Sequence, residues 1–546
     1  MKKKIISIML AAAMAFSLAA CGGGTDSSKS NEEKAKEVEL DVQKEIDTSR
    51  PLSSNAEKAE KVVVALNSDP TDLTPQNPNS TGKNEVLPEI YEALFDVIDG
   101  EYVPILAESY TEVDELHWNV KIRENIYDSE GNHITASDVV YSYNWLIETG
   151  NYQKYDLFGG IKQVDDYTVE FTWTSNPAVL SGLDMIWCRT YIFSEAAYNA
   201  HNFATDPIGT GPYVVSSFTS GSSVILEANE NYWQTDESQI GEMHTANVQT
   251  IEYRIIKEAA QRVIALETGN VNYAEQVDEN SIDEFLEGGT YAEDYEVYTV
   301  YDNRTYFTMF NQDDGKIGND INFRLACYYA INNEGLAEAL GFAAPAVTLG
   351  NPYYLDYQTK WESDENYMTT YDLDLAKEYL EKTDYNGETL QLIVVNLEIA
   401  ENIAQLIQNM LLNAGINVEI TSYEQATLDS KMGDPAEWDM AVYRCGHDAY
   451  VAGAWNICMN KEGRESGKTI NFINDDILQE KYELVSSLDG HTEDNLDDMQ
   501  QYWIDNAYYC GLAAVFNRTV YSNNIAALYV TGSGAMIPGA CTYYLD

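Results

Sequence analysis

The residue types that could do acid–base or phosphate chemistry are plentiful in this sequence, but their spacing does not point to a reaction. Asp and Glu together number 89, so adjacent pairs such as Asp313-Asp314 and Asp475-Asp476 carry little information about glycosidase chemistry. Residues 209–212 (Gly-Thr-Gly-Pro) are Gly-rich, but the Pro and the strand expected after it do not suit a phosphate-binding helix start. No GxSxG, Walker GxxxxGK or HExxH motif occurs. We therefore do not expect an enzyme.

Metal and redox chemistry are not indicated either. The six His are scattered and no CxxC pair occurs among the seven Cys, so a structural zinc site is not expected. We predict neither a metal nor a cofactor. Leaving Cys21 aside, the other six Cys could form disulfides outside the cytoplasm, and the sequence does not select a connectivity. In a body with its own large core, free buried thiols are the expected state for most of them.

The N-terminus has the pattern of a lipoprotein signal. Lys2 to Lys4 precede an apolar run over 5–18, whose 14 residues suit a signal sequence better than a bilayer-spanning helix. Small residues and then Cys21 follow, so we predict removal of residues 1–20 and acylation of Cys21. A plain secretory signal with a chance Cys is the alternative. The protein is therefore expected to be extracytoplasmic and lipid-anchored to the cell membrane.

Composition divides the rest of the chain into a tether and a folded body. Residues 22–60 contain no Phe, Trp or Tyr, so we predict that 21–60 form a lipidated, flexible tether. The whole chain is 45% hydrophobic, which predicts a large buried core beyond it. Its formal net charge of −57 repels phosphate backbones and anionic lipids, so we expect no nucleic-acid partner and membrane contact only through the lipid.

The periodicity of apolar residues predicts a mixed α/β body with at least two sheets. Strict alternation over 116–123 indicates a strand with one wet face, and a helix is expected to start after Thr135. Two βαβ units are expected, over 248–274 and 390–421, and a further apolar strand at 438–443 follows the second.

Five sequence motifs occur in order along the chain. The first has two parts, Pro-Ile-Leu-Ala-Glu-Ser-Tyr at 104–110 and Ile-Thr-Ala-Ser-Asp-Val-Val-Tyr-Ser at 134–142. The others are Ile-Gly-Thr-Gly-Pro-Tyr-Val-Val at 208–215, Asn-Glu-Asn-Tyr-Trp at 229–233, Phe-Arg-Leu-Ala followed by Ala-Ile-Asn within 323–332, and Tyr-Asp-Leu-Asp-Leu-Ala-Lys at 371–377 with the second βαβ unit. Together they resemble the extracellular solute-binding proteins of family 5, the oligopeptide-, dipeptide- and nickel-binding group of ABC importers. Leu325 and Asn332 depart from the Gln and Asp usual in the 323–332 motif. The resemblance extends over about residues 62–535.

The resemblance implies a two-lobe clamp like the type II, cluster C periplasmic-binding proteins, with an extra domain in the first lobe. We expect the first lobe at 61–295, the second at 296–505 and a return to the first at 506–546. The extra domain is expected at about 96–204. The chain would cross between the lobes near 300–310 and again near Asp505, and closure on a ligand would be a hinge motion.

The resemblance also implies which residues hold the ligand. In peptide-binding members an Asp at the position of Asp448 pairs with the peptide α-ammonium, and loop backbone at the position of Thr81, Gly82 and Lys83 pairs with the peptide main chain. Cys445 stands where a Trp is frequent. Val442 stands where a basic residue is frequent, and Arg444 is shifted and expected on the opposite face. The other candidate contacts are Arg444, Cys445, Gly446 and His447, with Tyr306, Asn311, Tyr450 and Trp455, for each of which a structural role is an equal alternative.

The function implied is that of a lipid-anchored, monomeric substrate-binding subunit of an ABC importer. It would capture peptides between its lobes and deliver them to membrane permease subunits that work with cytoplasmic ATPases. One alternative keeps the fold and changes the solute to a nickel complex or a sugar. Another is a surface sensor or adhesin lipoprotein that takes no part in transport.

Overall fold

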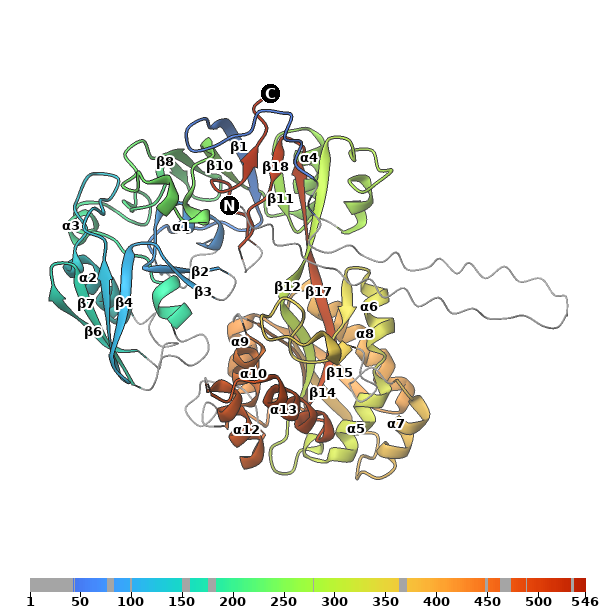
Figure 1. Ribbon diagram of the computed structural model, residues 1–546. Coiled ribbons are helices and arrows are strands. Elements are labelled where there is room, and N and C mark those ends of the chain that lie inside the picture. The colour runs from blue at the N-terminus through green and yellow to red at the C-terminus, as the bar shows by residue number, and fades with distance from the viewer. Residues whose placement is uncertain are drawn as a thin grey trace, which may run out of the picture. The chain divides into compact units, whose positions relative to one another are not determined.

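Figure 1 shows the computed structural model of the chain. The structure describes residues 43, 45–75, 83–98, 101–149, 158–174, 183–277, 279–362, 371–446, 450–461, 473–487, 489–531 and 535–546. The predicted signal sequence and Cys21 lie outside these ranges. Among the described residues, none of the helices combines the length and the apolar character that crossing a bilayer would require.

The elements alternate between strands and helices along most of the chain. The strands are β1 (Ala59–Leu66), β2 (Phe95–Ile98), β3 (Glu101–Pro104), β4 (Ala107–Asp114), β5 (His117–Ile122), β6 (Phe158–Asp165), β7 (Thr168–Trp173), β8 (Tyr213–Thr219), β9 (Ser223–Ala228), β10 (Val248–Ile255), β11 (Tyr273–Glu275), β12 (Tyr295–Phe310), β13 (Ala343–Pro345), β14 (Thr389–Val395), β15 (Asn417–Tyr423), β16 (Met440–Cys445), β17 (Tyr509–Ser522), β18 (Ile525–Ala527) and β19 (Thr542–Tyr543). The helices are α1 (Lys83–Ile90), α2 (Ala136–Glu148), α3 (Glu195–Ala200), α4 (Ala259–Glu267), α5 (Ile321–Ala330), α6 (Asn333–Leu340), α7 (Leu373–Leu380), α8 (Glu398–Ala414), α9 (Gln425–Met432), α10 (Val451–Met459), α12 (Asp476–Ser486) and α13 (Glu493–Asp505).

One large sheet carries most of the strands, in the order β15-β14-β16-β12-β17-β11-β1-β10-β9-β8, with β13 paired to β17. Both predicted βαβ units are confirmed. In the first, α4 links β10 to β11, and both strands pair in parallel with β1. In the second, α8 links β14 to β15, which pair in parallel directly. Parallel pairing follows because a helical crossover returns the chain in the same direction.

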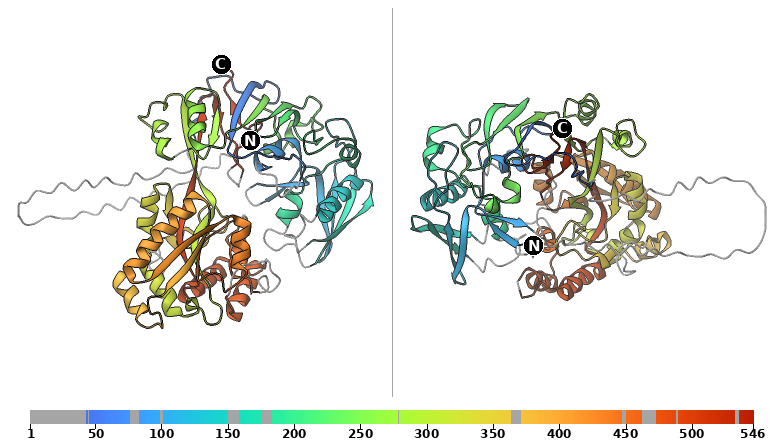
Figure 2. Two further views of the ribbon diagram at one scale, coloured as in Figure 1. Left: turned by 180° about the vertical axis from the view of Figure 1, so that it is seen from behind. Right: turned by 45° about the horizontal axis from the view of Figure 1, so that its top comes forward.

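The long strands β12 and β17 pair with each other in both halves of this sheet (Figures 1 and 2). They are antiparallel from Tyr295 to Tyr301, and again from Thr305 onward, with a register shift between Tyr301 and Thr305. On one side of the shift β11 joins β17, and on the other side β16 joins β12. We call the short stretch around the shift the crossing.

Hydrophobic clusters follow the two halves of the sheet. The largest cluster draws its buried residues from 306–515, and two others draw theirs from 62–295 and 520–543. The crossing therefore falls inside the range 300–310 predicted for the first crossover. Residues 508–515 pack with the 306–515 cluster. The chain therefore returns from this cluster to the other two within β17, later than the second crossover predicted near Asp505.

A separate four-stranded sheet, ordered β4-β5-β7-β6, occupies the region predicted as the extra domain. Its cluster of buried residues runs from Leu94 to Ile192 and adds Trp233. Helix α2 packs on this sheet and begins as predicted, because Thr135 and Asp138 form a capping box at its N-terminus.

The predicted tether ends earlier than residue 60. Arg50 forms an ion pair with Asp546, and Ser53 exchanges hydrogen bonds with Tyr543 through its backbone N–H and its hydroxyl oxygen. The strand β1 already begins at Ala59. Residues 50–60 therefore belong to the folded body, which sequence composition could not show because their partners lie at the other end of the chain.

The most distinctive sequence block, 208–215, is explained by close packing of backbone. A Cβ at Gly209 would lie 2.0 Å from the carbonyl oxygen of Ile90, and one at Gly211 would lie 2.6 Å from the carbonyl carbon of Ile90. Only Gly allows the two chain segments to meet there. The buried Tyr213 hydroxyl then donates to the Val248 carbonyl, which ties this block to the sheet.

Three of the thiols match the expectation of free buried Cys. Cys327, Cys510 and Cys541 are buried and free. Burial raises the pKa of both Cys510 and Cys541 to about 12, so these thiols stay protonated and unreactive at neutral pH.

Arg324, in the sequence motif at 323–332, is a buried arginine on α5 that binds two loops. Its guanidinium donates to the carbonyl oxygens of Gly318, Asn319, Asn506 and Ala507 at distances of 2.8 to 3.2 Å. Burial lowers its pKa to about 10. Ala507 has a positive φ of 47°, so the loop before β17 is held in a conformation that costs energy.

We expect Arg324→Ala to lower the free energy of unfolding by about 3 kcal/mol, because several buried carbonyl groups lose their donor at once. Urea denaturation of the two proteins measures this difference. Arg50→Ala is the matched control, since Arg50 is a half-buried surface arginine with an ion pair to Asp546, and its loss should change stability far less. Equal midpoints for wild type and Arg324→Ala would show that the loops do not depend on this side chain.

Candidate functional site

The strand β16 leads the chain to the predicted ligand-binding loop. It pairs with β12 so that Arg444 lies opposite Tyr306 and Cys445 lies opposite Thr305. Since Thr305 stands at the crossing, β16 ends beside the place where β12 and β17 pass from one half of the sheet to the other. Gly446 follows and is buried. His447 and Asp448 lie outside the described residues, so their roles stay predictions.

Tyr306 and Arg444 are brought together by this register. Directly opposed residues of an antiparallel pair share a face of the sheet, so both side chains lie on the same side. Tyr306 is buried, which raises its pKa, while the positive charge of Arg444 opposes that rise. Arg444 also shares this face with Val442, because alternate strand positions point the same way. The expectation that Arg444 faces the other side is therefore wrong.

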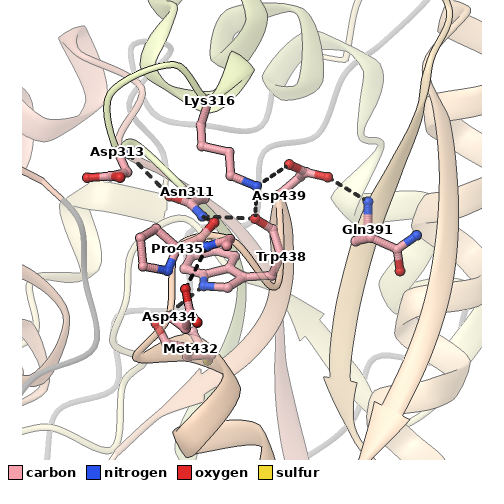
Figure 3. Close-up of polar contacts among 10 residues, drawn as sticks. Asn311, Asp313, Lys316, Gln391, Met432, Asp434, Pro435, Trp438 and Asp439 are labelled. Carbon is pink, nitrogen blue, oxygen red and sulfur yellow. Dashed lines mark hydrogen bonds and ion pairs between the residues drawn. The ribbon is translucent and has the colours of Figure 1, made fainter.

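Asn311 has a structural role in the described contacts (Figure 3). Its side chain is completely buried, and its Nδ2 donates to the carbonyl oxygens of Pro435 and Trp438, both at 2.8 Å. Lys316 adds an ion pair to Asp439 at 2.9 Å, and the other oxygen of Asp439 accepts from the Gln391 backbone N–H. This network holds the start of β16 between β12 and β14, at the end of β16 away from the crossing.

Tyr450 and Trp455 belong to the segment that follows the predicted loop: Tyr450 precedes α10, and Trp455 lies within it. Trp455, on α10, is fully buried and lies 6.2 Å from Trp361, centre to centre. Tyr450 is half-buried immediately before α10, and its ring meets that of His491 edge-on at 5.6 Å. Of the two, the half-exposed Tyr450 is the better candidate for a ligand contact.

The predicted backbone loop at Thr81, Gly82 and Lys83 is described only at its end. Thr81 and Gly82 lie outside the described residues, and Lys83 begins α1. The side chain of Cys445 is likewise not described. Asp448, His447, Thr81 and Gly82 are therefore carried forward as predictions.

The structure also reveals a buried polar group that the sequence did not single out. We call it the His244 cluster, and it consists of Glu89, Glu92, Asp96 and His244. The Nε2 of His244 lies 3.1 Å from Asp96 Oδ2, and its Nδ1 lies 4.0 Å from Glu92 Oε1. Glu89 accepts a hydrogen bond from the backbone N–H of Gly539, while its second oxygen finds no hydrogen-bond partner among the described residues.

Burial and mutual charge set the protonation of the His244 cluster. Burial raises the pKa of Glu89 to about 8 and also raises the pKa of Glu92. Burial alone would lower the pKa of His244, but the negative charge and hydrogen bond of Asp96, with the charges of both Glu, raise it to about 9. The hydroxyl of Tyr232 and the indole N–H of Trp233 donate to Glu92.

The only sequence signal of this cluster is the spacing of Glu89 and Glu92 within an otherwise apolar stretch. His244 and Asp96 come from distant segments, so their approach depends on the fold. In the described part of the chain, no group of His, Cys, Asp and Glu side chains is arranged to hold a metal ion. Glu89 belongs to α1, and its hydrogen bond with Gly539 ties this helix to the C-terminal segment.

A shallow surface cavity of about 490 Å³ lies elsewhere, against β10 and α4. It is lined by Arg254, Ile256, Lys257, Glu258, Gln261, Ile264, Ala265, Thr268 and Asn270. It shares no residue with β16, α10 or the crossing, so it does not bear on the predicted ligand site.

Comparison with protein-family models identifies the family of this chain. Residues 101–462, more than half of its length, match the model of the bacterial extracellular solute-binding proteins, family 5. The chain belongs to this family. Among the curated relatives, the glutathione-binding protein GsiB of Escherichia coli O6:K15:H31 (strain 536 / UPEC) is 27% identical over 396 residues, which are 68% of this chain and 71% of that protein.

Solved structures show the fold of this family 5 protein. The ABC transporter substrate binding protein CtaP of Listeria monocytogenes superposes with a TM-score of 0.73 at 17% identity, covering 90% of this chain and 100% of that one. The oligopeptide-binding protein AppA of Bacillus subtilis, solved in complex with a nonapeptide, gives a TM-score of 0.69 at 18% identity, with 90% and 99% covered. The fold is that of the type II, cluster C periplasmic-binding proteins, as predicted.

Proposed function

We propose that this family 5 protein is the substrate-binding subunit of an ABC importer and that its solute is a peptide. The observation that carries the peptide assignment is the 27% identity to a glutathione-binding protein over 68% of the chain, since glutathione is itself a tripeptide. The nonapeptide held by a protein of the same fold supports the same class of ligand. Permease subunits and their ATPases would be the partners, and the protein would act as a monomer.

We place the ligand where β16 leaves the sheet. The loop after Cys445 starts beside the crossing, and the crossing is the part of the chain that a hinge motion would bend. Asp448 would meet the α-ammonium of the peptide there. Arg444, on the same face as Tyr306, would offer a cation near the site. The lobes would divide at the crossing, at 301–305 and within β17.

Thermal unfolding with a peptide pool tests this proposal. A ligand that binds only the folded protein raises its stability by RT ln(1 + [L]/Kd). We expect a pool of free-amine tri- to pentapeptides to raise the melting temperature, and native mass spectrometry of the protein as purified to show a retained peptide. No shift with the pool, together with a clear shift in the presence of a sugar or a nickel complex, would replace peptide by that solute.

The lipid anchor is a further part of the proposal and rests on the sequence at Cys21. We expect the full chain expressed in a bacterium to partition into the detergent phase of a Triton X-114 extract, and Cys21→Ser to move it to the aqueous phase, because acylation requires the thiol. Intact mass of the two proteins gives the same answer independently. If the wild-type protein stays in the aqueous phase, the N-terminal sequence is a plain secretory signal and Cys21 is not acylated.

A further inference from the structure

A short segment between α6 and α7 contacts both the crossing and the helix that follows the ligand loop. We call residues 350–361 the strap. Near its start, Asn351 is 1% exposed, and its Nδ2 donates to the Asp302 carbonyl oxygen at 2.9 Å and to the Thr305 hydroxyl at 3.2 Å. Asp302 lies within the stretch where the β12 register shifts, and Thr305 is the first paired residue after it. One side chain of the strap therefore binds β12 at its irregular point.

The middle of the strap caps α10. Asp356 has a side chain that is 5% exposed, and its Oδ1 accepts from the backbone N–H of Val451 at 2.6 Å. Its Oδ2 lies 3.5 Å from the Ala452 backbone nitrogen and 3.6 Å from His491 Nε2. A carboxylate at these free N–H groups stabilises the first turn of the helix. That first turn comes directly after Tyr450, so Asp356 holds the chain where the loop from β16 ends.

The strap between these two anchors is internally bonded. The Asn351 Oδ1 accepts from the Tyr353 backbone N–H at 3.0 Å, and its carbonyl oxygen accepts from the Tyr354 N–H at 3.1 Å. The Tyr354 carbonyl in turn accepts from the Tyr357 N–H at 3.1 Å. Tyr354 is buried, and a Cβ at Gly350 would lie 2.5 Å from Val451 Cγ2. These bonds therefore join the two anchors through a short segment that is itself held by hydrogen bonds.

We propose that the strap couples bending of β12 at the crossing to the position of the first turn of α10. Asn351 and Asp356 are positioning residues in this arrangement, and neither contacts the ligand. Where the site of the proposed function is correct, the strap links lobe movement to the placement of the ligand loop. The coupling itself is a property of the ligand-free protein and does not depend on which solute binds.

Hydrogen exchange of the ligand-free protein tests the coupling. We expect Asn351→Ala to speed exchange of the α10 amides over 451–454 about tenfold, although the Asn351 side chain bonds β12 and not α10. Asp356→Ala should have the same effect by removing the cap directly. Should Asn351→Ala fail to fold, Thr305→Val keeps the shape of its side chain while removing the hydroxyl that accepts from Asn351. Unchanged α10 exchange in a folded Asn351 or Thr305 variant would overturn the proposal.

Asp372→Ala is the matched control, because Asp372 caps α7 through the N–H group of Leu375, and α7 packs on α5 and α8. It should speed exchange in α7 and leave α10 unchanged. Equal acceleration of α10 in this control would show a general loosening of the chain and would also overturn the coupling.

A binding measurement extends the test to the proposed function. With the pool of free-amine tri- to pentapeptides as the probe, Asn351→Ala and Asp356→Ala should each weaken the apparent affinity about tenfold, and Asp372→Ala should not. The double variant should bind the peptides no more weakly than the single variant with the lower affinity, because both changes break the same connection between β12 and α10. Additive losses would overturn the coupling. If the wild-type protein does not bind the peptide pool, peptide binding is refuted. The hydrogen-exchange result would still test the coupling through the strap.

Discussion

Asp448→Ala is expected to weaken the binding of a free-amine peptide by about 2–5 kcal/mol, which is roughly thirtyfold to several thousandfold in Kd. The reason is that a peptide α-ammonium enclosed near the crossing would lose its counter-charge and remain desolvated. Isothermal titration calorimetry with the peptide that gives the largest thermal shift measures the change. Folding should be unaffected, since residues that pack the 306–515 cluster are untouched.

Two comparisons separate the charge of Asp448 from its bulk. Asp448→Asn keeps the size and should lose nearly as much affinity as Asp448→Ala, while N-acetylation of the peptide should cost the wild type more than it costs either variant. Asp374→Ala is the matched control, because Asp374 is an exposed acid on α7. Full affinity in Asp448→Ala would remove this residue from the site and leave the ligand amine to another group.

The elements that the sequence predicted well are those whose signal is local. The strands and helices of both βαβ units were predictable because period-two and period-3.6 patterns are contained within each segment. The same holds for the start of α2, where Thr135 and Asp138 stand three residues apart and cap one another.

The positions that sequence reasoning missed depend on distant partners. The end of the tether was placed too late because Ser53 is held by Tyr543, almost five hundred residues away. The second crossover was predicted near Asp505 because no pattern within the segment shows that β17 continues from one hydrophobic cluster into the next. Asn351 and Asp356 are unremarkable in the sequence, and only the approach of β12 and α10 gives them their partners.

Stability should fall as the pH rises from about 4.5 to 9, on the order of 5 kcal/mol of it between pH 6.5 and pH 9, because of the His244 cluster. His244 has a pKa raised to about 9 in the folded protein, so its stabilisation is complete below its unfolded pKa of 6.5 and is lost as pH rises through 9. Glu89 has a pKa raised to about 8, so the folded state also holds this proton more tightly than the unfolded chain does. Both groups therefore act in the same direction. Thermal unfolding between pH 5 and pH 9 measures the sum.

Glu89→Gln isolates one part of this dependence. The amide cannot ionise, so the variant should lose less stability than the wild type between pH 6 and pH 9, and its advantage should grow with pH. It keeps an acceptor for the Gly539 N–H, and the comparison uses the slope of stability against pH. Glu195→Gln, an exposed acid on α3, is the control and should leave the slope unchanged. Parallel curves for wild type and Glu89→Gln would show that Glu89 is already ionised in the folded protein, and the slope would then belong to His244 alone.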